Sequence, residues 1–186
     1  LVRGRIASGG RHHPIAGGMI ETAENLRREF NISREAQDEL AYTSQQRAKA
    51  AMESGKFDDE IVPVHVTKRG KTTVVDRDEH PRPQTTPDDL AGLRAVRARL
   101  DDGATVTAGN ASGQNDGAAA CIVTTPEMAD KLGLRPLGRL VSWAVTGLEP
   151  ERMGLGPVSS SQKALARAGL TLKDMDLLEI NEAFAA

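Results

Sequence analysis

Short apolar runs alternate with segments of helical periodicity along this chain, and the alternation limits the fold more than any other feature. Val, Ile and Thr dominate several of these runs, as is typical of strands. The strand-like runs are residues 61–66, 72–75, 105–108, 118–123, 140–146 and 177–180. The first two are close enough to form a hairpin. Strands that alternate with helices favour an α/β architecture.

The helical segments carry their own start and stop signals. Apolar residues recur every three or four positions from Met19 to Phe30, which predicts an amphipathic helix. Ser33 is a suitable N-cap for a second helix that stops at Ser54-Gly55. Further helices are predicted from Thr86-Pro87 along a stripe to Leu100, from Pro126 to Gly133, from the 154–157 loop to Gly169, and after Asn181.

Composition and charge exclude several classes of protein. Aromatic residues make up only 3% of the 186 residues, so the core depends on aliphatic side chains. A formal net charge of −2 gives no electrostatic reason to expect a nucleic acid or an anionic membrane as partner. The longest apolar run, residues 118–123, is far shorter than the ~20 residues of a membrane span. Cys121 is the only cysteine, which excludes an internal disulfide and a cysteine-rich zinc site.

The compartment and the extent of the chain follow from the same observations. No leader sequence is recognisable and the cysteine content is low, so a reducing, cytoplasmic setting is expected. The chain starts without a Met and stops at Ala186 within a helix-forming string, so we expect an internal fragment.

Two polar motifs lie where predicted strands end. In the first, Gly109, Gly113 and Gly117 surround Asn110 and Ser112 and allow close backbone approach to a neighbour or ligand. By itself this motif is interpreted as a structural turn, and it matches neither a P-loop nor a dinucleotide fingerprint. The second motif is residues 181–184. An amide there could polarise a carbonyl oxygen, but taken alone Asn181 is interpreted as a helix cap.

Taken together, these motifs resemble the thiolase family. The resemblance rests on residues 106–113 with 115–120 and on residues 178–186. Matching segments between and before them are residues 136–139, 142–143 and 153–157, and Met19, 22–25, 33–34, 37–38 and 59–64. The similarity covers residues 19–186. The family includes the acetyl-CoA C-acetyltransferases and the 3-ketoacyl-CoA thiolases. It implies acyl transfer between coenzyme A thioesters.

The resemblance implies a fold as well as an activity. Thiolases consist of two stacked βαβαβαββ halves with a loop domain inserted in the first. On that template, residues 1–18 are an irregular lead. Residues 19–127 would form the loop domain and the end of the N-terminal half, and residues 128–186 would begin a truncated C-terminal half.

Site residues are carried over on the same basis. Ser112 would hydrogen-bond the pantetheine of coenzyme A, and Arg82 would lie near its adenine or phosphate end. Asn181 would hold a water of an oxyanion hole. The walls of the pantetheine tunnel would be Met19, Ala108, Met153 and Phe184. Gln114 and Leu100 depart from residue types that are common in the family.

The resemblance also implies that reactive groups are missing. The nucleophilic cysteine of thiolases would precede this chain, and the catalytic histidine and second cysteine would follow it. Cys121 is interpreted instead as a buried packing residue. His12 and His13 echo a His-Pro-Ile motif of the family but at the wrong place. No metal and no covalently bound cofactor are expected; coenzyme A is the substrate.

Two functional hypotheses therefore stay open. The first is an enzyme part whose whole protein acts on coenzyme A thioesters as a homo-oligomer, a dimer or a tetramer. The second is a catalytically inactive module that binds coenzyme A or serves as a scaffold by pairing with other chains.

Overall fold

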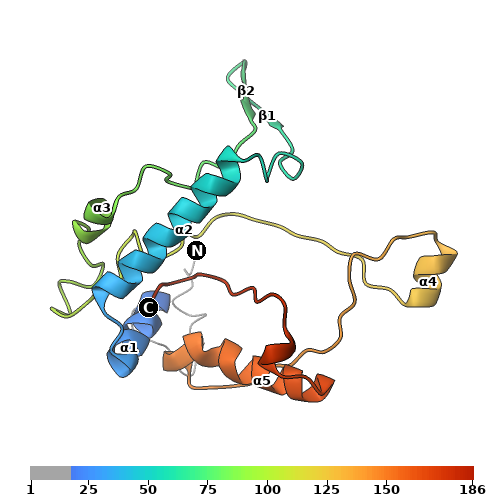
Figure 1. Ribbon diagram of the computed structural model, residues 1–186. Helices are drawn as coiled ribbons and strands as arrows, with labels where there is room; N and C mark the ends of the chain where they lie inside the picture. Colours follow the sequence, from blue (N-terminus) through green and yellow to red (C-terminus); the bar gives the residue numbers. More distant parts are fainter. Residues whose placement is uncertain (1–17) are drawn as a thin grey trace. The chain divides into compact units, whose positions relative to one another are not determined.

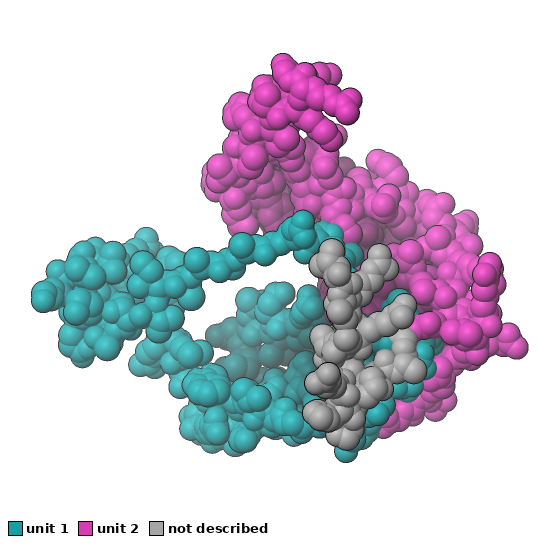
Figure 2. All heavy atoms as spheres, turned by 180° about the vertical axis from the view of Figure 1, so that it is seen from behind, with its two compact units in different colours: residues 1–25, 113–181 teal, residues 26–112, 182–186 magenta. Residues whose placement is uncertain are grey.

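The computed structural model describes residues 18–186 of the chain. His12, His13 and most of the predicted irregular lead lie outside the described residues. Contacts divide the described chain into two compact units, coloured separately in Figure 2. One comprises the residues up to Asn25 together with Gly113–Asn181, and the other comprises Leu26–Ser112 with Glu182–Ala186. The two units are described separately below.

Two helices open the described chain, as their periodicity and caps predict. Helix α1 spans Met19–Phe30 and α2 spans Arg34–Glu53. Ser33 is the N-cap of α2, and its hydroxyl accepts a hydrogen bond from the amide of Ala36 at 3.2 Å. Ser54 is the C-cap, followed by Gly55 at a positive φ of 70°. Both helix predictions are confirmed.

The predicted hairpin is also present. Strands β1 (Val64–Lys68) and β2 (Lys71–Val75) pair antiparallel, with Val64 opposite Val75 and Lys68 opposite Lys71. Arg69 and Gly70 connect them with φ of 51° and 77°. Two successive positive φ angles are those of a type I′ turn, whose twist suits a two-residue hairpin. Every residue of both strands is exposed.

Helix α3 begins where predicted but is much shorter. It spans only Pro87–Ala91, so the prediction of a helical stripe as far as Leu100 is wrong. The reason is a contact from α2: Nη2 of Arg34 donates to the carbonyl oxygens of Leu90 and Leu93. A continuing helix would use those oxygens itself. Gly92 also disfavours continuation.

The unit that includes Gly113–Asn181 contains the helices that follow α3. They are α4 (Pro126–Lys131), the 3₁₀ helix η2 (Pro150–Leu155), α5 (Gly156–Ala168) and the 3₁₀ helix η3 (Leu172–Asp174). Gly133 and Gly169, at φ of 63° and 68°, follow α4 and α5. The positions predicted for these two helices are confirmed. Among residues 18–186, no helix combines the length and apolar character that a membrane span needs.

Four predicted strands are not paired strands in the structure. Residues 105–108, 118–123, 140–146 and 177–180 are not assigned to any strand ladder, and Figure 1 shows no arrow on them. A strand needs a neighbour with which to exchange backbone hydrogen bonds. Within the described residues, the β1–β2 pair forms the only sheet. Apolar side chains in the segments 118–123 and 177–180 are accordingly uncovered: Ile122 is 86% exposed and Leu177 is 83% exposed. Val106 and Thr107, in the segment 105–108, are buried.

The predicted last helix is absent as well. Residues 181–186 are not helical, so Asn181 does not cap a helix. The backbone there bonds across the chain instead, because the amide of Ala185 donates to the carbonyl oxygen of Asn110 at 3.0 Å. An antiparallel bridge joins Ala111 to Phe184.

Candidate functional site

The glycine-rich motif begins with a buried turn that holds its own shape. Thr107 and Asn110 are 0% and 3% exposed. The side-chain oxygen of Asn110 accepts from the amide of Thr107 at 2.7 Å, and the Thr107 hydroxyl accepts from the amides of Gly109 and Asn110 at 3.1 and 3.2 Å. Nδ2 of Asn110 donates to the carbonyl oxygen of Thr105 at 3.1 Å. The backbone amides of the turn thus find partners within it.

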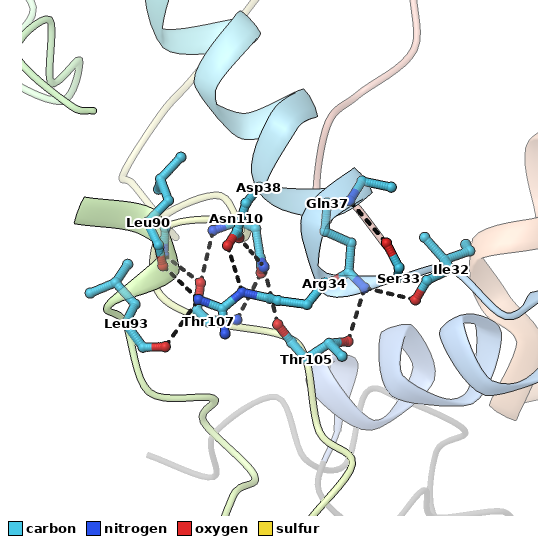
Figure 3. A network of polar contacts seen from close by, with 12 residues as sticks. Ile32, Ser33, Arg34, Gln37, Asp38, Leu90, Leu93, Thr105, Thr107 and Asn110 are labelled. Carbon is cyan, nitrogen blue, oxygen red and sulfur yellow. Dashed lines mark hydrogen bonds and ion pairs between the residues drawn. The ribbon is translucent and has the colours of Figure 1, made fainter. Parts of the chain in front are cut away.

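Two side chains of α2 connect this turn to the helix (Figure 3). Oδ1 of Asp38 accepts from Nδ2 of Asn110 at 3.0 Å, while Oδ2 accepts from Nε of Arg34 at 2.7 Å. Nε2 of Gln37 donates to the hydroxyl of Thr105 at 2.9 Å. Gln37 and Asp38 are both buried. A connected, buried set of polar groups fixes geometry strongly because an unsatisfied member is costly there.

Gly109 allows the turn to approach α3 and the residues just after it. A Cβ at Gly109 would lie 2.6 Å from Cδ2 of Leu90 and 2.6 Å from Cδ1 of Leu93. Leu90 is itself buried. Any side chain at position 109 would therefore require both leucine side chains to shift.

The chain after this turn lies against the second polar motif. The amide of Ser112 donates to the carbonyl oxygen of Ala183 at 2.9 Å, next to the Ala111–Phe184 bridge. The hydroxyl of Ser44, on α2, donates to Oε2 of Glu182 at 2.7 Å. The structure thus brings the motif of Ser112 and the motif of Phe184 together within one unit, although about 70 positions separate them in the sequence.

Two other predicted site residues belong to this unit. Ala108 is exposed on the turn itself. The side chain of Arg82 is exposed, and its backbone amide donates to Oε1 of Gln45 on α2 at 2.8 Å.

Three predicted site residues belong to the other unit. Met19 opens α1, Met153 lies in η2, and Asn181 is exposed in an extended segment. Nδ2 of Asn25 donates to the carbonyl oxygen of Glu151 at 3.1 Å, which connects α1 to the helix that carries Met153. A single pocket shared by all seven predicted residues stays a prediction.

Cys121 does not occupy the buried position predicted for it. Its side chain is exposed, within the unpaired extended segment that precedes α4. Burial of this residue requires a neighbouring strand or a covering helix, and the described chain supplies neither. Among residues 18–186, no three His, Cys, Asp or Glu side chains form a group that could hold a metal ion.

The contribution of α2 to the site could not be predicted from local sequence patterns. In the sequence, Gln37 and Asp38 are only part of a segment that resembles the family. No local pattern distinguishes these two polar residues from others on a helix with a weak apolar stripe. Their partners Thr105 and Asn110 lie 68 and 72 positions away.

Comparison with known families covers nearly the whole chain. Residues 14–127 match the family described as "Thiolase, N-terminal domain", and residues 134–186 match "Thiolase, C-terminal domain". The acetyl-CoA acetyltransferase of Escherichia coli K12 is 53% identical over 165 residues, which are 89% of this chain and 41% of that protein. The 3-oxoadipyl-CoA/3-oxo-5,6-dehydrosuberyl-CoA thiolase of the same organism is 51% identical over 169 residues, again 41% of that protein.

Solved structures give the same result. The acetyl-CoA acetyltransferase of Bacillus anthracis superposes with a TM-score of 0.84 at 47% identity, covering 94% of this chain and 43% of that one. Human mitochondrial 3-ketoacyl-CoA thiolase gives a TM-score of 0.83 at 45% identity, covering 97% of this chain and 44% of that one. These neighbours confirm the α/β thiolase fold, here in part, since the chain spans about two fifths of its relatives' length. Because both family matches and these structures agree over almost all of its residues, the chain belongs to the thiolase family.

Proposed function

We propose that this chain is part of an acyltransferase that moves acyl groups between coenzyme A thioesters. The reaction would be thiolysis or condensation of acetoacetyl-CoA or of a longer 3-ketoacyl-CoA. Relatives about 50% identical to the chain are named acetyl-CoA acetyltransferases or thiolases, which supports the proposal. The same proposal includes the division into residues 19–127 and 128–186. It also includes a whole protein that is a homo-oligomer in the cytoplasm.

The observation that carries this proposal is the pairing of residues 110–112 with residues 183–185. Ser112 then offers a hydroxyl beside the segment that carries the aromatic ring of Phe184, in a chain where aromatic residues are rare. A pantetheine tail carries two amides along an apolar stem, so a neutral hydrogen-bonding group next to an apolar wall suits it.

Each predicted residue has a stated part in binding. Ser112 would bond an amide of the pantetheine, with Ala108, Phe184, Met19 and Met153 as apolar walls. Arg82, whose guanidinium is exposed, would pair with a phosphate. Asn181 would hold the water that donates to the thioester oxygen as negative charge develops there. The acyl-accepting thiolate is not assigned to this chain.

Steady-state kinetics of the protein encoded by the complete reading frame test the proposal. Thiolysis of acetoacetyl-CoA is followed while the CoA concentration is varied. A lost neutral hydrogen bond is worth about 1 kcal/mol, so Ser112→Ala should raise the KM for CoA roughly fivefold. Ser160→Ala is a matched control, because the Ser160 hydroxyl donates only within α5, to Gly156 and Pro157.

Two outcomes count against the proposal in different ways. An unchanged KM for Ser112→Ala would remove Ser112 from the site. Absence of thiolysis in the unmodified protein, with CoA still bound, would favour the inactive CoA-binding or scaffold module.

A further inference from the structure

The side chain of Asn110 contacts both α2 and the backbone of the turn that precedes Ser112. Its Nδ2 donates to Asp38 and to the carbonyl oxygen of Thr105, and its Oδ1 accepts from the amide of Thr107. Its own carbonyl oxygen accepts from the amide of Ala185, which neighbours Phe184. Ser112 follows two residues later and bonds to Ala183. Asn110 therefore links α2 to the strand-like pairing that carries the proposed site.

We propose that Asn110, held from α2 by Asp38, is a positioning residue that sets the affinity for the CoA tail. It does so by fixing the turn from which Ser112 extends, and this inference rests on the function proposed above. Asn110 does not contact the ligand; its side chain is buried and its hydrogen bonds go to Thr105, Thr107 and Asp38.

The geometry explains why the effect should reach Ser112. The amide of Ser112 and the carbonyl oxygen of Asn110 form the two backbone bonds that flank the Ala111–Phe184 bridge. A rotation of the Asn110 backbone would break one of them and change the direction of the other. Ser112 and Phe184 would then no longer be held side by side, and part of the binding free energy would be spent on ordering them.

The contacts of Asp38 explain why asparagine is needed at position 110. Oδ1 of Asp38 faces Nδ2 of Asn110, while its Oδ2 is bonded to Arg34. Aspartate at position 110 would place a carboxylate oxygen against both the Asp38 carboxylate and the Thr105 carbonyl oxygen. The replacement has almost the same shape, so its effect comes from the negative charge that it places beside the Asp38 carboxylate at a buried position.

Four variants of the protein encoded by the complete reading frame separate positioning from stability. Asn110→Asp reverses the contact with Asp38. Thr107→Val removes the hydroxyl that accepts from Gly109 and Asn110 while keeping its shape, and Thr107→Ser restores that hydroxyl. Glu39→Gln is the control, since Glu39 is an exposed carboxylate adjacent to Asp38 on α2.

The expected result is a change in KM for CoA with little change in kcat. Asn110→Asp should raise this KM at least about tenfold, with kcat at saturating CoA within about threefold of the unmodified protein. Thr107→Val should raise the KM several-fold, and Thr107→Ser and Glu39→Gln should leave it within about twofold. A purely structural role predicts something else, because loss of folded protein lowers the measured kcat but leaves KM unchanged.

The outcomes separate this inference from the proposed function. If the unmodified protein shows a measurable KM for CoA and both Asn110→Asp and Thr107→Val keep it, the positioning role is wrong and the proposed function stands. If the unmodified protein neither turns over nor binds CoA, both fail. Should Asn110→Asp give no folded protein, the Thr107→Val and Thr107→Ser pair decides: equal KM values overturn the inference, and a raised KM in Thr107→Val alone supports it.

Discussion

At Gly109 the absence of a Cβ atom allows the turn to approach α3 and the residues just after it. A Cβ there would lie 2.6 Å from side-chain carbons of both Leu90 and Leu93, so both side chains have to move. We expect Gly109→Ala to lower the free energy of unfolding by about 1–3 kcal/mol, the usual cost of overpacking. Urea unfolding of the protein encoded by the complete reading frame measures this.

The control for Gly109 is another glycine with room around it. At Gly147 a Cβ would have no neighbouring atom within 4 Å and the φ angle is not positive, so Gly147→Ala should be close to neutral. Equal destabilisation by the two substitutions would show that the contact with Leu90 and Leu93 does not limit position 109.

Cys121 leads to a prediction about the chain as given. It is exposed and is the only thiol, and the family's nucleophile is expected elsewhere. Without that nucleophile the acyl-transfer step loses most of its acceleration. We therefore expect residues 1–186 alone to show no thiolysis of acetoacetyl-CoA above background. Turnover that disappears on Cys121→Ala would instead make this cysteine the nucleophile.

Among the helices, α3 illustrates how a cap depends on pH. The hydroxyl of Thr86 donates to Oδ2 of Asp89 at 2.6 Å, and the amide of Thr86 donates to the same oxygen at 2.9 Å. The side-chain bond first, and then the backbone bond, hold the pKa of Asp89 below its ordinary value of 3.8. A carboxylate whose pKa falls on folding stabilises the folded form above its unfolded pKa. That stabilisation is lost as the pH falls through the folded pKa.

Replacement of Thr86 tests this cap. Thr86→Ala removes the stronger bond, so the pKa of Asp89 should rise toward its ordinary value, while Thr86→Ser should leave it low. Carbon NMR of the Asp89 carboxyl group over an acid titration measures both. Identical titration curves for the two variants would show that the hydroxyl does not contribute.

Whether an element could be predicted depends on whether its cause lies nearby in the sequence or far away. Caps at Ser33 and Thr86 and the stops at Gly133 and Gly169 act within a few residues, so the sequence indicates them directly. The end of α3 could not be predicted, because Arg34 lies 56 positions from Leu90 and takes its carbonyl oxygen. The prediction of four further strands is wrong for a related reason. Alternation of apolar and polar residues indicates an extended segment, but it does not indicate whether a partner strand is present.

The candidate site divides in the same way. Its two motifs can be predicted because short polar runs follow strand-like segments, and the resemblance to thiolases implies that Ser112 and Phe184 lie together. The network behind them was missed because Asp38 meets Asn110 only through the tertiary fold. No periodicity or cap signals such a contact.

At the scale of the whole molecule, exposed apolar side chains determine how the chain is expected to behave in solution. In the extended segments before and after α4, Ile122, Val123 and Leu137 are more exposed than core residues of a stable protein. The extended segment ending at residue 180 exposes Leu177, Leu178 and Ile180 in the same way. Unpaired backbone and clustered apolar side chains together favour association with other strands.

We therefore expect residues 1–186, expressed alone, to be oligomeric or to melt without a cooperative transition. Sedimentation velocity over a range of concentrations and a calorimetric melt measure this, with the protein encoded by the complete reading frame as the comparison. Exposure of Ile122, Leu177 and their neighbours should make the chain sediment faster as its concentration rises, since apolar surface is removed from water on association. Leu177→Lys together with Ile122→Lys should weaken that dependence, because charges on exposed strands oppose pairing. A sharp melt from a monomer at every concentration would show instead that these 186 residues form a self-sufficient domain, and would favour the scaffold module over the enzyme part.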